Sequence, residues 1–153
     1  MSKKRVVQKE NALGKKIPKS TEDALSYLNK RPSWRFSRCD MEHEKWSVFQ
    51  DGVIRDDIIE KLKSYEGMTW GEIQKASGGK SEGNGNNSHF ENVSDFIKEA
   101  QRRINELKLY EDQLFSLRLK GKPRLYGIID NGVFDVIWYD KEHEIYKSQK
   151  KHT

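Results

Sequence analysis

The chain has little cysteine and no long hydrophobic run. Its 153 residues include a single cysteine, Cys39, and only 34% are hydrophobic; the mean hydropathy is −0.97. One cysteine cannot form an internal disulfide, and no Cys/His set has zinc spacing, so we expect a reducing compartment and no metal. No window approaches about eighteen apolar residues and no signal-peptide segment follows Met1, so we expect a cytoplasmic protein without a membrane span.

Motifs of nucleotide hydrolysis and of serine nucleophiles are also missing. Gly78-Gly79-Lys80-Ser81 has the last letters of a phosphate-binding loop, but it has neither the upstream glycine nor a preceding hydrophobic strand. The sequence contains no nucleophile elbow. We therefore do not expect an ATPase or a serine hydrolase.

Aromatic residues compensate for the small aliphatic content. Four Trp, six Tyr and six Phe supply large apolar surfaces to a chain that is 35% charged. We therefore expect one compact domain over residues 20–153.

The basic charge of the chain is concentrated at its N-terminus. Residues 1–19 carry seven basic side chains and one acidic side chain, a charge of +6, whereas the whole chain carries +5. This segment is predicted to be a flexible basic tail, which either contacts phosphates without sequence specificity or is simply solvated.

Helices are predicted mainly in the middle of the chain. Apolar spacing favours helices over 54–66, with Gly67 as the C-cap, and over 94–108, with Ser94 as the N-cap. Thr69 and Glu72 form the pattern of a capping box. A shorter helix is expected from Ser20 or Thr21 to the stretch before Pro32. The Gly-, Ser- and Asn-rich segment 77–88 is predicted to be a flexible loop.

Strands are predicted at both ends of the domain. Residues 34–36 alternate like a strand, and three further strands are expected over 114–119, 124–129 and 133–138. The turns between them are predicted at 121–123 and at Asp130-Asn131-Gly132, which gives an antiparallel meander. Residues 144–147 are expected to add a short fourth strand. With the 94–108 helix packed on this sheet, the fold class is α+β.

Cationic and proton-transferring side chains gather around this predicted sheet. Arg124 and Tyr126 fall on the same face of their strand because side chains alternate. Basic side chains, a phenol and an imidazole placed together can hold a phosphate and move protons. A solvated basic sheet face gives the same alternation, so both interpretations stay open.

The C-terminal segment resembles a known family. Residues 117–146, L-R-L-K-G-K-P-R-L-Y-G-I-I-D-N-G-V-F-D-V-I-W-Y-D-K-E-H-E-I-Y, resemble the C-terminal half of RelE/ParE-superfamily toxins. In those proteins a basic strand leads to an Arg-hydrophobic-Tyr strand, a hydrophobic strand and a terminal His near a Tyr. The resemblance implies a helical layer on an antiparallel sheet.

The resemblance also implies an activity, metal-independent cleavage of RNA by a toxin-like endoribonuclease. It requires no cofactor. The catalytic residues implied are Arg118, Arg124, His143 and Tyr146. The nucleic-acid contacts expected beside them are Lys120, Lys122, Tyr126 and Lys147. The implied partners are RNA, the ribosome and an antitoxin protein.

Other interpretations of the same residues remain. The chain can instead be a non-catalytic accessory module of a mobile element that binds nucleic acid or a protein partner. Asp140 can orient His143 or cap its own turn. His89, next to the 77–88 loop, can join a site or simply be exposed.

Overall fold

We describe a computed structural model of the chain. It describes residues 26–50, 54–76 and 88–146, with the backbone alone for 54–56. The predicted tail at 1–19, the start of the first helix at Ser20 or Thr21, and loop residues 77–87 lie outside the described residues.

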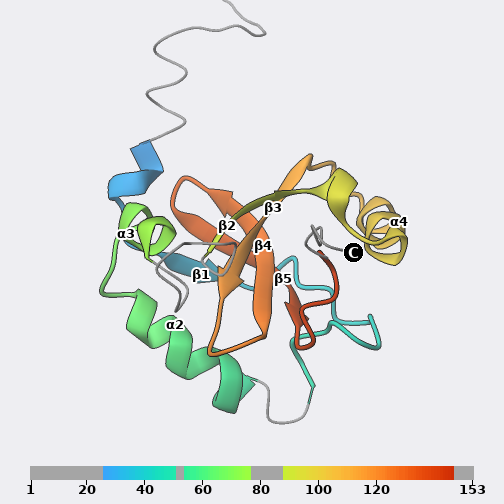
Figure 1. Ribbon diagram of the computed structural model, residues 1–153, viewed down its shortest axis with the longest axis horizontal. Coiled ribbons are helices and arrows are strands. Elements are labelled where there is room, and N and C mark those ends of the chain that lie inside the picture. Colours follow the sequence, from blue (N-terminus) through green and yellow to red (C-terminus); the bar gives the residue numbers. More distant parts are fainter. Residues whose placement is uncertain (1–25, 51–53, 77–87, 147–153) are drawn as a thin grey trace, which may run out of the picture.

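The helices are short and come from three parts of the chain (Figure 1). In chain order, the helices are η1 Ser26–Asn29, η2 Ile54–Ile59, α2 Glu60–Tyr65, α3 Trp70–Lys75, η3 Val93–Asp95 and α4 Lys98–Glu106. η2 runs directly into α2, so residues 54–65 form one helical segment, close to the predicted 54–66. The capping box predicted at Thr69 and Glu72 is present at the start of α3.

Five strands form one mixed sheet. The strands are β1 Ser33–Arg35, β2 His89–Asn92, β3 Gln113–Arg118, β4 Arg124–Asp130 and β5 Val133–Asp140. Their order across the sheet is β1-β5-β4-β3-β2. β1 is parallel to β5, and every other neighbouring pair is antiparallel. The predicted α+β class and the predicted β3–β4–β5 meander are therefore confirmed.

Each face of the sheet has its own hydrophobic core. α2 and α3 lie on one side of the sheet and α4 on the other (Figure 1). On the first side, Ile73 packs with Phe115 and Leu117. On the second, Ile104 packs with Leu114 and Trp138. Because adjacent strand residues point to opposite faces, Leu114 and Phe115 enter different cores.

The predicted 94–108 helix begins later than expected. Residues 93–95 form the 3-10 turn η3, and α4 starts at Lys98 with Ile97 as an N-cap that lacks a side-chain hydrogen bond. Phe96 instead forms an isolated antiparallel bridge with Tyr146. A tertiary contact with the C-terminal segment thus replaces the first helical turn predicted from Ser94.

The fourth strand predicted at 144–147 is wrong for residues 144–146, and Lys147 lies outside the described residues. Residues 141–146 turn back after β5, and only Tyr146 makes a bridge. The Asp140 carboxylate accepts the backbone N–H groups of Glu144 and Ile145 at 3.0 and 2.8 Å. These two hydrogen bonds hold the backbone in a turn, and a turn is incompatible with the extended conformation of a strand.

Smaller corrections concern two helix ends. The helical segment 54–65 has Glu66 as its C-cap, and Gly67 does not adopt the positive φ of a glycine cap. Of the first predicted helix, the described part of the chain contains one 3-10 turn, η1. Within the described parts of the chain, no helix is long and apolar enough to cross a membrane.

Candidate functional site

One face of the sheet carries a row of polar side chains toward the β3–β4 hairpin. The register places His89 opposite Ser116, Ser116 opposite Tyr126, and Arg118 opposite Arg124. Arg124 is in turn opposite Asp140. Residues paired across neighbouring strands share a face. We call the following set the polar sheet face: His89, Glu91, Ser116, Arg118, Arg124, Tyr126 and Asp140.

Glu91 is the centre of this face. It is 5% exposed, and its Oε1 accepts a hydrogen bond of 2.8 Å from the hydroxyl of Tyr126. Its Oε2 lies 3.1 Å from His89 Nε2. A buried carboxylate requires such partners because desolvation without them is costly. Glu91 therefore links the half-buried imidazole of His89 to the buried hydroxyl of Tyr126.

Asp140 positions the C-terminal turn over the same face. Its carboxylate caps the backbone of residues 144 and 145, as described above, and the His143 N–H donates to the Asp140 carbonyl at 3.4 Å. No hydrogen bond joins the Asp140 carboxylate to the His143 imidazole among the contacts of the described residues. Of the two roles left open by the sequence, capping the turn is the one observed.

His143 lies half-buried in this turn in a left-handed backbone conformation, φ 56°. Burial lowers the pKa of His143, the positive charges of Arg124, His89 and Lys122 lower it further, and Glu91 opposes them. The imidazole is therefore mainly neutral at neutral pH and available as a base. The charges that act on His143 therefore belong to residues of the polar sheet face and of the β3–β4 hairpin.

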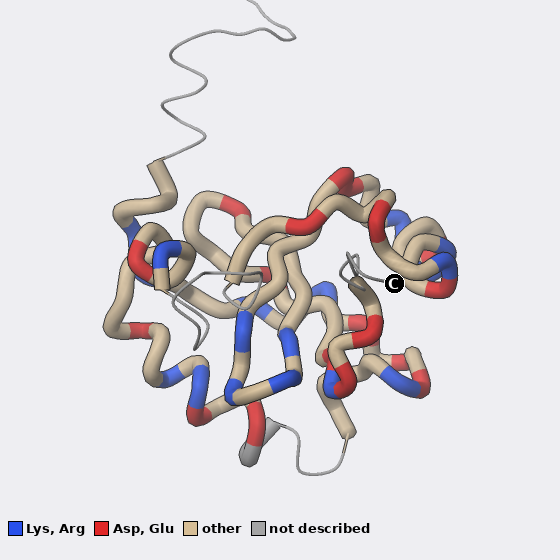
Figure 2. Tube along the Cα trace, in the orientation of Figure 1, with Lys and Arg blue, Asp and Glu red and all other residues tan. Residues whose placement is uncertain are grey.

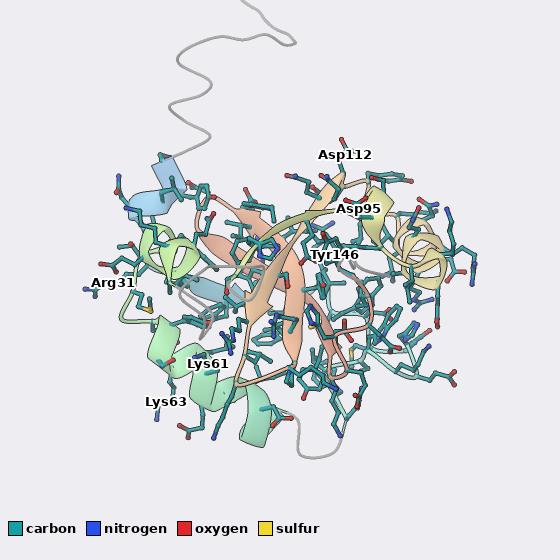
Figure 3. All side chains as sticks on the ribbon, viewed as in Figure 1. Arg31, Lys61, Lys63, Asp95, Asp112 and Tyr146 are labelled. Carbon is teal, nitrogen blue, oxygen red and sulfur yellow. The ribbon has the colours of Figure 1, made fainter. Side chains whose placement is uncertain are left out.

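Tyr146 reaches the site from the end of the turn. It is half-buried near Asp95 (Figure 3). Burial raises the pKa of Tyr146, as do the negative charges of Glu91 and Asp95. The phenol is protonated at neutral pH, so it can donate a hydrogen bond or a proton.

The β3–β4 hairpin supplies positive charge at the edge of the face. Figure 2 shows Lys and Arg positions concentrated along this hairpin, beside those of α2. Lys120 and Lys122 are exposed, and Lys122 Nζ lies 3.4 Å from Glu142 Oε1. Exposed ammonium groups on a turn can contact phosphates as mobile point charges.

Arg124 is buried, unlike the lysines of the hairpin. It is 3% exposed, and its Nη1 donates to the carbonyls of Gly121, Lys122 and Pro123 at 2.7–3.0 Å. Arg124 therefore fixes the hairpin that carries the lysines and adds its charge to the environment of His143.

The structure brings most of the predicted site residues together, but at different depths. Arg118, His143 and Tyr146 are half-buried on the described surface. Tyr126 is completely buried, so it holds Glu91 and cannot touch a nucleic acid in this conformation. Lys147 lies outside the described residues.

Glu91 was not predicted as a site residue from the sequence, and no partner was predicted for His89. The His89-x-Glu91 spacing was the available signal, because alternate strand residues share a face. Their strand, β2, was not predicted. Tyr126, the partner of Glu91, is 35 residues away in the sequence.

Metal-ligating groups do not cluster in the described part of the chain: it holds no set of three or more His, Cys, Asp or Glu side chains placed to bind a metal ion. Cys39 and His43, the one pair with short spacing, belong to structural contacts instead. His43 Nδ1 accepts the N–H groups of Lys45 and Trp46, and its ring stacks on Trp46 at 4.1 Å between centroids.

The chain was compared with protein-family models, with curated proteins and with solved structures. No family model, no curated protein and no solved structure matches it, so any functional assignment depends on the groups of the polar sheet face themselves.

Proposed function

We propose that this protein binds RNA at the polar sheet face and cleaves it without a metal ion, as a toxin-like endoribonuclease. The observation that carries the proposal is the 3.1 Å contact between His89 and the buried Glu91, with His143 on the turn that follows Asp140 and the cations of the hairpin at the edge of the same face. Metal-free RNA cleavage requires a base, an acid and positive charge at the phosphate, and these groups can supply all three.

In the proposed step, neutral His143 removes the proton from an RNA 2′-hydroxyl. The 2′-oxygen attacks the adjacent phosphorus, and the bond to the 5′-oxygen breaks. The leaving oxygen takes a proton from an acid. The products are a 2′,3′-cyclic phosphate and a 5′-hydroxyl end. Arg118 and Lys122 stabilise the negative charge that develops on the phosphate oxygens.

His89 is the better of two candidates for the acid. Glu91 at 3.1 Å forms an ion pair with the protonated imidazole. The pKa of Tyr146 is raised, which makes its phenol a weaker acid at neutral pH. We therefore assign proton donation to His89 and a positioning role to Tyr146 at the edge of the face.

A second candidate function, binding without cleavage, is favoured by the burial of Arg124 and Tyr126. Both side chains are used within the protein, one by the hairpin carbonyls and one by Glu91. A basic hairpin on a stable sheet is sufficient for an accessory module that binds nucleic acid.

The test is cleavage of end-labelled RNA in EDTA, with and without ribosomes. We expect products with cyclic phosphate ends from the wild type. His143→Asn and His89→Asn should each slow cleavage by about 100-fold or more, the usual scale for a positioned acid or base. Arg102→Gln removes an exposed cation of α4 and serves as the control, with a rate within about twofold of wild type.

Two outcomes contradict the proposal. RNA that is bound but never cut, in either condition, supports the accessory module instead. Products with 3′-hydroxyl ends, or full activity in His143→Asn, exclude the stated chemistry.

The proposed function also implies where the protein acts and which molecules it binds. It places the protein in the cytoplasm, with RNA as substrate, free or on the ribosome. An antitoxin protein is expected to hold the activity in check.

A further inference from the structure

A second feature of the molecule, which shares Arg118 with the polar sheet face, is a pocket between α2, α3 and the β3–β4 hairpin. Its volume is about 380 Å³, within the range of small-molecule sites. Its cationic lining residues are Lys61 of α2 and Arg118 and Lys120 of the hairpin, and none of the described residues that line it is acidic. This composition favours an anionic ligand.

The remaining walls are suited to a flat organic group. Met68, Ile73 and Leu119 give the pocket an apolar side, and Tyr65, Ser64 and Ser88 add hydroxyls. A bare phosphate would leave the apolar side unused. A ligand with an anionic group at one end and a planar ring at the other matches both parts of the lining, and a nucleotide has this chemistry.

The walls are held by specific hydrogen bonds. The Tyr65 hydroxyl donates to the Arg118 carbonyl at 2.6 Å, and the Arg118 N–H donates to Ser88 Oγ at 2.8 Å. Lys61 Nζ lies 5.1 Å from the centre of the Tyr65 ring. The pocket is therefore a built part of the fold, although residues 77–87, which connect Ala76 to Ser88, lie outside the described chain.

The pocket adjoins the polar sheet face. Arg118 lines the pocket and is opposite Arg124 across the sheet. Ser88 lines the pocket, and the next residue, His89, begins the polar sheet face. The two sites therefore meet at Arg118 and at the start of β2, where a single strand of RNA can reach both.

We infer that this pocket binds one nucleotide of the RNA, next to the phosphate that is cleaved, with the phosphate group at Lys61 and Lys120 and the base against the apolar side. The assignment to RNA depends on the proposed function, whereas the affinity for a nucleotide can be measured without any cleavage.

The test is an NMR titration of the full chain with 5′-AMP, 5′-UMP, adenosine, uridine and inorganic phosphate. At least one nucleotide should bind at least about fivefold more tightly than its nucleoside and than phosphate. Lys61→Gln and Lys120→Gln should each weaken that binding by about tenfold, as expected for loss of a charged hydrogen bond.

Lys63→Gln is the matched control. Lys63 is on the same helix and is exposed, but it does not line the pocket, and Figure 3 shows it at the outer edge of α2. Nucleotide affinity should change by less than about twofold in this variant. An equal loss in Lys63→Gln would show general attraction to positive charge and would overturn the inference, as would equal affinity for phosphate and nucleotide.

Different results would contradict RNA cleavage at the polar sheet face and nucleotide binding in the pocket. Nucleotide binding without RNA cleavage would overturn the proposed function and leave the pocket in place. RNA cleavage that is unchanged in Lys61→Gln and Lys120→Gln, with no nucleotide bound at millimolar concentration, would overturn the pocket alone. A short oligoribonucleotide that binds more tightly than either mononucleotide would support RNA, and not a free nucleotide, as the natural ligand.

Discussion

At the scale of single residues, His143 should set the acidic limit of the RNA cleavage that we propose. Burial and then the charge of Arg124 lower the pKa of His143 below its usual 6.5. The base stays neutral as the pH falls through 6.5, so the acidic limb of kcat/KM against pH should lie below that value. Lys122→Gln removes one of the cations that lower the pKa of His143, so the acidic fall in kcat/KM should occur at a higher pH. A wild-type limb above pH 6.5 would contradict His143 as the base.

A second residue-scale prediction concerns the ion pair of the buried Asp40 with the half-buried Arg103. Burial alone would raise the pKa of Asp40, but hydrogen bonds from Arg103 and Trp138 outweigh it and lower the pKa to about 2. Arg103 donates to both carboxylate oxygens, at 2.7 and 2.8 Å. Arg103→Leu leaves a buried charge and should cost about 3–5 kcal/mol in the free energy of unfolding.

The pH dependence of the free energy of unfolding of Arg103→Leu tests this explanation. Without Arg103, burial raises the pKa of the Asp40 carboxyl, so lowering the pH from 7 toward 4 protonates it and should narrow the stability gap to wild type. Urea unfolding at both pH values measures the gap. Arg102→Leu, on the exposed side of α4, should change stability by about 0.5 kcal/mol at most. A gap that widens on acidification would contradict this role for Arg103.

At the scale of elements, the irregularity between β4 and β5 depends on Gly127. The register shifts between Tyr126 and Gly127, and a Cβ at Gly127 would overlap the carbonyl oxygen of Asp135 and lie 2.7 Å from Cζ of Phe134. Gly127→Ala should therefore destabilise the protein by about 1–3 kcal/mol or more. Thermal unfolding provides the measurement.

Gly67→Ala is the control for that substitution, because its nearest neighbour to an added Cβ is 4.0 Å away. We expect it to be neutral or slightly stabilising. Equal stability of the two variants would show that β5 can move away from β4 without cost.

The elements also show what the sequence could predict. The β4–β5 turn was predictable because Asn131 and Gly132 tolerate the positive φ of 53° and 89° that they adopt. The start of α4 was not, because Phe96 is held by Tyr146, fifty positions later in the chain. A local sequence pattern therefore predicts a turn set by its own residues, but it does not predict a helix start set by a contact with a distant residue.

The same distinction applies to the candidate site. The cations of the hairpin are adjacent in sequence and were identified. The burial of Arg124 and Tyr126 depends on the pairing of strands in the sheet. The role of Glu91 depends on its hydrogen bond with Tyr126, which is far away in the sequence. Whether a polar residue faces solvent or the protein interior is a tertiary property that alternation alone does not determine.

At the scale of the whole molecule, we expect the two cores to unfold together. They share the sheet, since Phe115 and Leu114 are neighbours in β3 but belong to opposite cores. Ile73→Ala on one side and Ile104→Ala on the other should each destabilise by about 2–5 kcal/mol. Each should shift one common transition in tryptophan fluorescence and far-UV circular dichroism.

Ile59→Ala is the control for this pair, because Ile59 is 41% exposed and its truncation removes little buried surface. Its midpoint should stay close to that of wild type. Separate transitions for the two core variants would show two units instead of one domain.

The parallel pairing of β1 with β5 has a consequence for biosynthesis. Ser33 pairs with Val133 and Arg35 with Asp135, so a ribosome must add about a hundred further residues before β1 meets its neighbour, which takes about 5–20 s at ordinary elongation rates. The turn that carries His143 is made later still. The polar sheet face, which needs β2 to β5 and that turn, therefore cannot form until residue 143 has been added to the chain.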